Sequence, residues 1–249
     1  MFLSEYFVLE LLIGGGCFAL SLGAAAYVKY AFNRGKEIPI RSGRTGAEIA
    51  RMILRDQDVH DVQVVEHEGF LSDHYNPGDK TLNLSSDVYH GQNAASAGVA
   101  AHEVGHALQH AQGDLTMWGR TILVYPAHFG GMLAPYLAGF GLMLGAATQV
   151  AKGVPGLAYW MLMIGVVLFA VSALCAIVIV FNEFNASARA RTSLVRLGIT
   201  RPGEEDDTVK SVLNAAGLTY VAAAATALLW LLYYLWRAGI IGGGGRRDD

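Results

Sequence analysis

Four long stretches of this chain carry almost no charge, and they limit the possible fold more than any other feature. A helix that crosses about 30 Å of hydrocarbon needs about 20 mostly apolar residues. Stretches of that length occur at residues 6–28, 127–150, 154–181 and 218–237. The sequence therefore predicts a membrane protein, an α-helical bundle with four transmembrane helices.

The overall composition agrees with a membrane protein and excludes several other classes. Apolar residues make up 53% of the chain and charged residues 16%, whereas soluble domains are about a quarter charged. A net charge of −3 gives no basic surface for nucleic acid. Cys17 and Cys175 both lie in apolar runs, which indicates buried thiols and no disulfide framework. Residues 1–6 contain no Lys or Arg, so the first stretch is expected to be a retained helix and no cleaved signal peptide.

The distribution of positive charge predicts how the chain lies in the cell membrane. A tight turn around Lys152 joins the second and third stretches, which places the polar regions 31–121 and 182–217 on the same face. Of the 18 Lys and Arg residues, those outside this face are Lys152, Arg237, Arg246 and Arg247. The positive-inside rule makes the face with both polar regions cytoplasmic and places both termini outside. The tail 242–249, a glycine run followed by charges, is expected to be disordered.

The larger polar region, 31–121, has the pattern of a small α+β structure. Residues 45–55 have apolar positions at helical spacing. Residues 62–65 are expected to form a short strand, and residues 70–85 a hairpin around the turn Asn76-Pro77-Gly78-Asp79. Residues 93–112 are rich in alanine and contain no proline, which predicts a helix.

This last helix carries an H-E-x-x-H motif, His102-Glu103-Val104-Gly105-His106. Residues four apart on a helix differ by about 40° and about 6 Å of rise, so the two imidazoles point the same way and can share one zinc ion. Glu103 projects about 100° away, where it can take a proton from water and pass it to a leaving amine. The alternative is a pair of helix histidines that bind nothing, and the uninterrupted helix argues against it.

A catalytic zinc needs a third protein ligand, and Glu183 is the candidate. It follows the third apolar stretch by two residues and is expected on the same face of the membrane as the motif. The alternative is a solvated carboxylate at a helix end, and spacing alone leaves both open. Glu10 lies inside the first stretch, where an ionisable group is either functional or close enough to the interface to reach it.

Two further candidates lie near the motif. His110 continues the face of His102, but its Cα is about 12 Å along the axis, too far to bind the same metal ion. It is expected either to contact a metal ligand from behind or to face solvent. Asp73 and His74 precede the turn of the hairpin. They either stabilise that turn or contact the substrate.

Several blocks of this sequence resemble a known family. SGRTGAEIAR, LSDHYNPGDKTLNLS, AAHEVGHALQHAQG, NEFNASARA and LNAAGLTYVAAA, in that order, are similar to the YugP-type membrane zinc metallopeptidases and more distantly to the HtpX-like gluzincins. The resemblance implies a gluzincin-like region that binds one Zn²⁺ per chain through His102, His106 and Glu183, with Glu103 as the catalytic base. Where the HtpX-like pattern has Asp, this chain has Ser187, whose hydroxyl can orient a ligand but supplies no charge.

The resemblance also implies how a substrate binds. An extended peptide is expected to pair with an edge strand of the hairpin, which satisfies its backbone and presents one peptide bond to the metal. Asp73, His74 and Tyr75 are the candidate substrate-binding residues. His74 and Tyr75 are also the candidates to stabilise the oxyanion.

The predicted function is hydrolysis of peptide bonds in membrane or membrane-proximal proteins. The partners are accordingly peptide substrates and the lipid bilayer, with no nucleic acid, and the oligomeric state is left open. Two alternatives are a zinc-binding membrane scaffold without proteolytic activity and a hydrolase of a lipid amide or ester.

Overall fold

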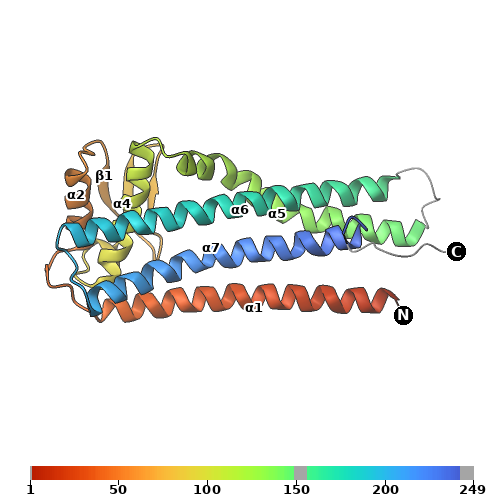
Figure 1. Ribbon diagram of the computed structural model, residues 1–249, viewed down its shortest axis with the longest axis horizontal. Coiled ribbons are helices and arrows are strands. Elements are labelled where there is room, and N and C mark those ends of the chain that lie inside the picture. The colour runs from red at the N-terminus through yellow and green to blue at the C-terminus, as the bar shows by residue number, and fades with distance from the viewer. Residues whose placement is uncertain (1, 149–155, 242–249) are drawn as a thin grey trace. The chain divides into compact units, whose positions relative to one another are not determined.

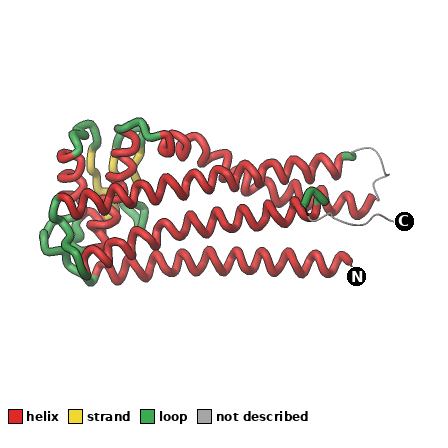
Figure 2. The backbone as a smooth tube through the Cα atoms, viewed as in Figure 1, coloured by secondary structure: helices red, strands yellow, loops and turns green. Residues whose placement is uncertain are grey.

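The computed structural model describes residues 2–148 and 156–241, most of them in helices (Figures 1 and 2). The chain forms two compact units. We call them the apolar unit (Met1–Ala19, Arg120–Ile179 and Val221–Asp249) and the mixed unit (Leu20–Gly119 and Val180–Tyr220). In chain order the elements are α1 (Phe2–Lys36), α2 (Gly46–Asp56), β1 (Gln63–His67), β2 (His74–Asn76), β3 (Thr81–Ser85), α3 (Ser86–Tyr89), α4 (Ala94–Ala111), α5 (Leu115–Thr148), α6 (Leu157–Arg196) and α7 (Glu204–Arg237).

Three of the described helices are long and apolar enough to cross a membrane, namely α1, α6 and α7. Helix α5 is bent by 42° between Tyr125 and His128, and it becomes a fourth candidate span if its two parts count as one. The sequence has proline at position 126, and proline commonly bends or breaks a helix because it lacks a backbone N–H. The structure thus confirms the apolar helices and leaves the four-span count as a prediction.

The described residues of the apolar unit are joined by close helix packing and by a polar cluster of Glu10, Tyr233 and Arg237. A Cβ at Gly141 of α5 would lie 2.6 Å from the backbone nitrogen of Leu162 of α6, so glycine permits this approach. Between α1 and α7, the hydroxyl of Tyr233 donates to Glu10 Oε1 at 2.6 Å. Arg237 lies 3.7 Å from the same oxygen. The ionisable group of the first stretch is therefore paired with α7.

The sheet of the mixed unit has the strand order β1-β3-β2. Strands β2 and β3 form the antiparallel hairpin that the sequence predicts, with His74 opposite Asn83 and Asn76 opposite Thr81. Strand β1 pairs with the other side of β3 in parallel. Strand β2 is therefore an edge of the sheet, and it is the strand next to α4 in the site described below.

Helices α2 and α4 form the core of the mixed unit together with the sheet. The predicted helix at 45–55 begins with a capping box, in which Thr45 and Glu48 each bind the other's backbone N–H. Asn93 caps α4 by accepting from the N–H of Ser96 at 3.0 Å. The shared core includes Ile49, Ile53, Leu82, Leu84 and Val104, all at most 1% exposed. This packing fixes α4, which carries the H-E-x-x-H motif.

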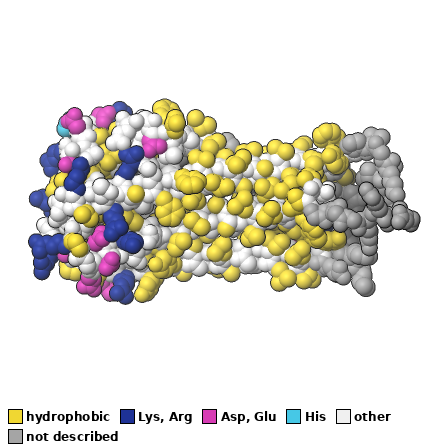
Figure 3. Space-filling model, viewed as in Figure 1, with side chains coloured by type: hydrophobic (Ala, Val, Ile, Leu, Met, Phe, Trp, Pro, Cys, Tyr) yellow, Lys and Arg dark blue, Asp and Glu magenta, His cyan; other side chains and the backbone are white. Residues whose placement is uncertain are grey.

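Polar and apolar surfaces follow the two units. On the face that Figure 3 shows, charged side chains gather over the mixed unit and hydrophobic ones over the apolar unit. Cys17 and Cys175 are buried and unbridged, as expected. The predicted turn around Lys152 and the predicted disordered tail 242–249 lie outside the described residues.

Candidate metal centre

Two histidines and one glutamate come together in the interior of the mixed unit. His102 and His106 lie one turn apart on α4, with ring centroids 4.7 Å apart. Glu183 of α6 faces them, and each of the three residues offers one ligand atom within 4.8 Å of the other two. All three are at most 8% exposed. A carboxylate buried this deeply needs a compensating charge or strong hydrogen bonds.

A glycine inside the motif lets α6 reach the histidines. A Cβ at Gly105 would lie 2.5 Å from the backbone carbonyl oxygen of Ala186, closer than real Cβ contacts allow. The absence of a side chain at this position therefore permits the close packing of α4 on α6. Glu183 lies three residues before Ala186, nearly one turn along the same helix, and this packing brings it beside the imidazoles.

The distances among the three donors fit a tetrahedral zinc site. Glu183 Oε2 is 3.2 Å from His102 Nε2 and 3.6 Å from His106 Nε2. Zinc bonds of about 2.0–2.1 Å at tetrahedral angles separate two ligand atoms by about 3.3 Å. Two imidazoles and one carboxylate also form a ligand set typical of catalytic zinc, which leaves the fourth position for water. The donor set thus fits zinc both in chemistry and in spacing.

Each imidazole is oriented by a second contact at its other nitrogen. Ser187 Oγ lies 3.1 Å from His102 Nδ1, in the position in which the sequence predicts a supporting hydroxyl. Gln109 Oε1 lies 2.9 Å from His106 Nδ1. The tautomer with hydrogen on Nδ1 can donate to each of these oxygens, and it leaves the Nε2 lone pair, on the side of Glu183, for a metal ion.

Gln109 was missed by the sequence argument, and it connects α4 to α6. Its Nε2 donates to the carbonyl of Asn182 and to Asn185 Oδ1, both at 3.0 Å. The Asn182 amide donates back to Gln109 Oε1 at 3.0 Å. These contacts fix which way the amide points, so that its oxygen faces His106. The available signal was its position three residues after His106, on the same helix face.

We expect Gln109→Met to weaken zinc binding by about 10–100-fold, because the imidazole of His106 loses the acceptor that orients it. Competition with a chromogenic chelator measures this affinity without requiring activity. The control is Gln112→Met at the exposed end of the same helix, where the lost partner is Arg189. Equal zinc affinity in the Gln109 and Gln112 variants would contradict the orienting role.

Glu103 is held at the edge of the sheet. Its Oε2 accepts the backbone N–H of Tyr75 at 3.0 Å, so the outer edge of β2 faces this carboxylate. The Tyr75 hydroxyl lies 2.8 Å from His110 Nδ1. Burial raises the pKa of the Tyr75 phenol to about 12, so the hydroxyl stays protonated at neutral pH. His110 therefore contacts Tyr75 and is not part of the buried trio.

The other two candidate substrate residues, Asp73 and His74, have different surroundings in the structure. Asp73 Oδ1 accepts the N–H of Ser85 at 2.7 Å, and the Ser85 hydroxyl bonds the same carboxylate. Burial raises the pKa of the Asp73 carboxyl, although these hydrogen bonds lower it. His74 is exposed, with Nδ1 2.8 Å from the carbonyl of Ser72. Of the two, Asp73 lines the cleft described next and His74 does not.

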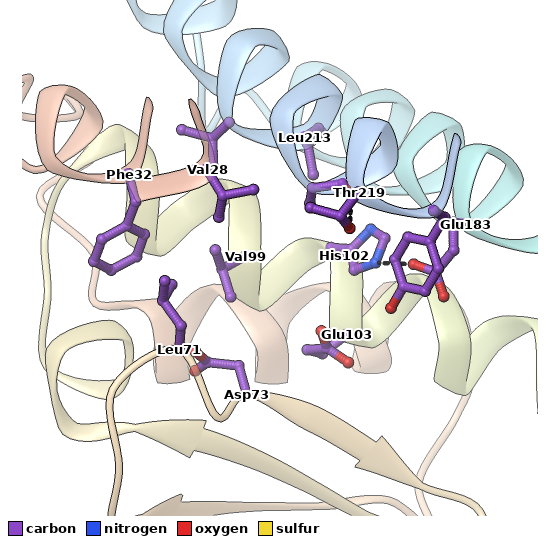
Figure 4. Close-up of a pocket in the computed structure, with 13 residues that line it drawn as sticks. Val28, Phe32, Leu71, Asp73, Val99, His102, Glu103, Glu183, Leu213 and Thr219 are labelled. Atoms are coloured by element: carbon purple, nitrogen blue, oxygen red, sulfur yellow. Dashed lines mark hydrogen bonds and ion pairs between the residues drawn. The ribbon is translucent and has the colours of Figure 1, made fainter. Parts of the chain in front are cut away.

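A cleft of about 210 Å³ opens beside the trio. Its polar end is formed by His102, Glu103, Glu183, Asp73, Thr219 and Tyr220. Figure 4 shows Glu103 and His102 extending from α4 into this space, with Thr219 above them on α7. Thr219 and Tyr220 were not candidates in the sequence argument, although the resemblance had included the block LNAAGLTYVAAA that contains them.

Comparison with known proteins identifies the family of this chain. Residues 11–239 match the model of a family described as "putative neutral zinc metallopeptidase". This chain belongs to that family. It is also 37% identical over 220 residues to "Putative membrane protease YugP" of Bacillus subtilis (strain 168), across 87% of this chain and 90% of that protein. The predicted YugP-type resemblance is thereby confirmed. No solved structure matches the chain.

Proposed function

We propose that the protein is a membrane-embedded, zinc-dependent endopeptidase. His102, His106 and Glu183 would hold the zinc ion, and Glu103 would act as the general base. The observation that carries the proposal is the spacing of the three buried donors, 3.2 and 3.6 Å from the carboxylate oxygen to the two imidazole nitrogens, beside an open cleft. Membership of a zinc metallopeptidase family supports the same function.

Zinc, when bound, supplies Lewis acidity that makes water more acidic and a carbonyl carbon more electrophilic. The Glu103 carboxylate then accepts a proton from the attacking water and delivers it to the departing amine. Its hydrogen bond to the Tyr75 N–H limits rotation of the carboxylate, which keeps it positioned for both transfers.

The developing negative charge on the carbonyl oxygen needs a hydrogen-bond donor. The Thr219 hydroxyl donates to the carbonyl of Ala216 at 2.7 Å, within its own helix. Tyr220 is the neighbouring residue of the cleft lining and carries a phenol O–H, and we propose it as the donor to this oxygen. The sequence argument had considered His74 and Tyr75 for this role, but the Tyr75 hydroxyl contacts His110 and His74 lies outside the lining.

The edge strand β2 supports binding of an extended peptide. The N–H of Tyr75 points from β2 to Glu103, so the edge of β2 that does not pair with β3 runs beside the proposed base. A peptide that pairs with this edge passes the base in an extended conformation.

The helices that line the cleft indicate where substrates come from. Val28 lies on α1, Glu183 on α6 and Leu213 on α7, and each of these helices also carries an apolar window long enough for a membrane span. We therefore propose membrane or membrane-proximal proteins as substrates. From the charge distribution we also propose that the site faces the cytoplasm, with four spans and both termini outside.

The cleft lining favours a peptide over a phospholipid. Among the described residues that line it, none is Lys or Arg, so no basic side chain is present to hold a phosphate headgroup away from the metal. The Glu103 carboxylate, which the proposed zinc ligand set does not use, also disfavours a phosphate beside it. This observation separates the proposal from hydrolysis of a phospholipid ester or amide.

Metal removal tests the proposal directly. The full chain, purified in detergent, should contain about one zinc per chain by elemental analysis and should cleave an unfolded membrane protein. A chelator should remove the metal together with the activity, and added zinc should restore both. Zinc without any peptide hydrolysis would favour a scaffold, and hydrolysis of lipid esters alone would favour the lipid alternative.

A further inference from the structure

The end of the cleft beyond the polar residues is walled by apolar side chains. They come from four segments of the mixed unit, namely α1, the loop before β2, α4 and α7, and they are Val28, Phe32, Leu71, Val99, Val212, Leu213 and Ala216. Figure 4 shows Val28, Val99 and Leu71 converging on one side of His102. The apolar wall is therefore continuous with the proposed reaction centre.

The wall is preformed by tight packing. Phe32 is 1% exposed, and its ring meets the ring of Phe70 edge to face at 5.6 Å, which holds the loop before β2 against α1. A Cβ at Gly35 would lie 2.9 Å from the Cβ of Ala95, so α1 also packs closely on the start of α4. Leu213 is 4% exposed. A pocket with walls fixed in this way can select by size and shape.

Charge and volume limit what the pocket accepts. The acidic and basic side chains of the described lining are the proposed zinc ligands His102 and Glu183, the base Glu103, and Asp73, beside the neutral phenol of Tyr220. The Asp73 carboxylate accepts hydrogen bonds from the N–H and the hydroxyl of Ser85. It is therefore not held in position to bind a cationic substrate side chain. The whole cleft measures about 210 Å³, below the roughly 300–1,000 Å³ of pockets for drug-sized ligands. A cleft of this size can accommodate one side chain beside the reaction centre.

We infer that this apolar end is the specificity pocket of the proposed peptidase, and that it takes one aliphatic side chain from a residue adjoining the scissile bond. The inference rests on the proposed function. One methylene in a hydrophobic pocket changes the specificity constant by about 10–200-fold. Leucine at this position is accordingly preferred over alanine by at least about tenfold, and over aspartate and lysine by more.

The test varies one side chain of the pocket wall and one residue of the substrate. The zinc-loaded full chain in detergent cleaves a set of peptides that differ at the residue beside the scissile bond, with cleavage sites assigned by mass spectrometry. Val28→Phe fills the pocket, so kcat/KM for the leucine peptide falls by about tenfold or more. The value for the alanine peptide stays within about threefold, so most or all of the leucine preference is lost.

The matched control is Val195→Phe, which makes the same change at a position 46% exposed on α6 and outside the cleft lining. It keeps the leucine preference. A preference for a charged side chain in the unsubstituted chain, or an unchanged leucine preference in the active Val28→Phe protein, overturns the inference.

A binding measurement keeps this inference separate from the proposed function. Fluorescence anisotropy of labelled peptides with the Glu103→Gln protein reports pocket occupancy even if the unsubstituted chain hydrolyses nothing. Tighter binding of the leucine peptide to the Glu103→Gln protein, and its loss in the Glu103→Gln, Val28→Phe double variant, supports the pocket. If the unsubstituted chain hydrolyses no peptide, that result rejects only the peptidase. Equal binding of leucine and aspartate peptides overturns the pocket whatever the activity.

Discussion

Glu103→Gln is expected to abolish peptide hydrolysis while leaving zinc bound. The glutamine side chain has nearly the same size, and its oxygen can still accept the N–H of Tyr75, so the fold of the site is kept. An amide cannot take a proton from water, and loss of a general base costs about 10²–10⁴-fold in rate. The measurement is cleavage of an unfolded membrane protein, with elemental analysis of the same preparation.

A suitable control is Glu37→Gln, the same change at an exposed residue that follows α1. It should leave both zinc content and cleavage unaltered. Normal proteolysis by the Glu103 variant would reject the role of Glu103 as base. Loss of zinc from that variant would instead indicate that Glu103 contributes to metal binding.

The motif could be predicted from sequence because its geometry is local. His102, Glu103 and His106 lie within five residues on one uninterrupted helix, and helical periodicity alone places both imidazoles on one face. The hairpin was predictable for the same reason, since its turn residues and alternating strands are neighbours in the chain. The structure shortens its strands to β2 and β3. The separate strand expected at 62–65 forms as β1 (Gln63–His67), and its parallel pairing with β3 is a contact that no local pattern encodes.

The remaining parts of the site depend on contacts between distant segments. Glu183 is 81 residues from His102, and its position beside the histidines depends on how closely α4 and α6 pack. Nothing in the sequence around Gln109 or Tyr220 distinguishes them from other helix residues. Gln109 is identified by its contacts with α6, and Tyr220 by its place in the cleft lining. The sequence argument proposed Tyr75 as a substrate-binding residue. In the structure its backbone N–H donates to Glu103, and its hydroxyl contacts His110. Strand alternation alone does not identify these partners.

Gly105→Ala is expected to destabilise the mixed unit and to weaken zinc binding together. The new methyl group would lie 2.5 Å from the carbonyl oxygen of Ala186, which is backbone and has no rotamer to change. Helices α4 and α6 must therefore move apart, and overpacking of this kind costs about 1–3 kcal/mol. The same movement carries Glu183 away from the imidazoles. Thermal unfolding in detergent and chelator competition measure the two effects.

Gly98→Ala provides a control on the same helix. A Cβ at Gly98 would lie 3.5 Å from Val209 Cγ1, an ordinary contact, so this variant gains up to about 1 kcal/mol of helix propensity without a clash. The two alanine variants share that propensity gain, and a difference in stability between them therefore reports the contact with Ala186. If Gly105→Ala matches Gly98→Ala in both stability and zinc affinity, α6 can move without cost, and the position of Glu183 does not depend on this glycine.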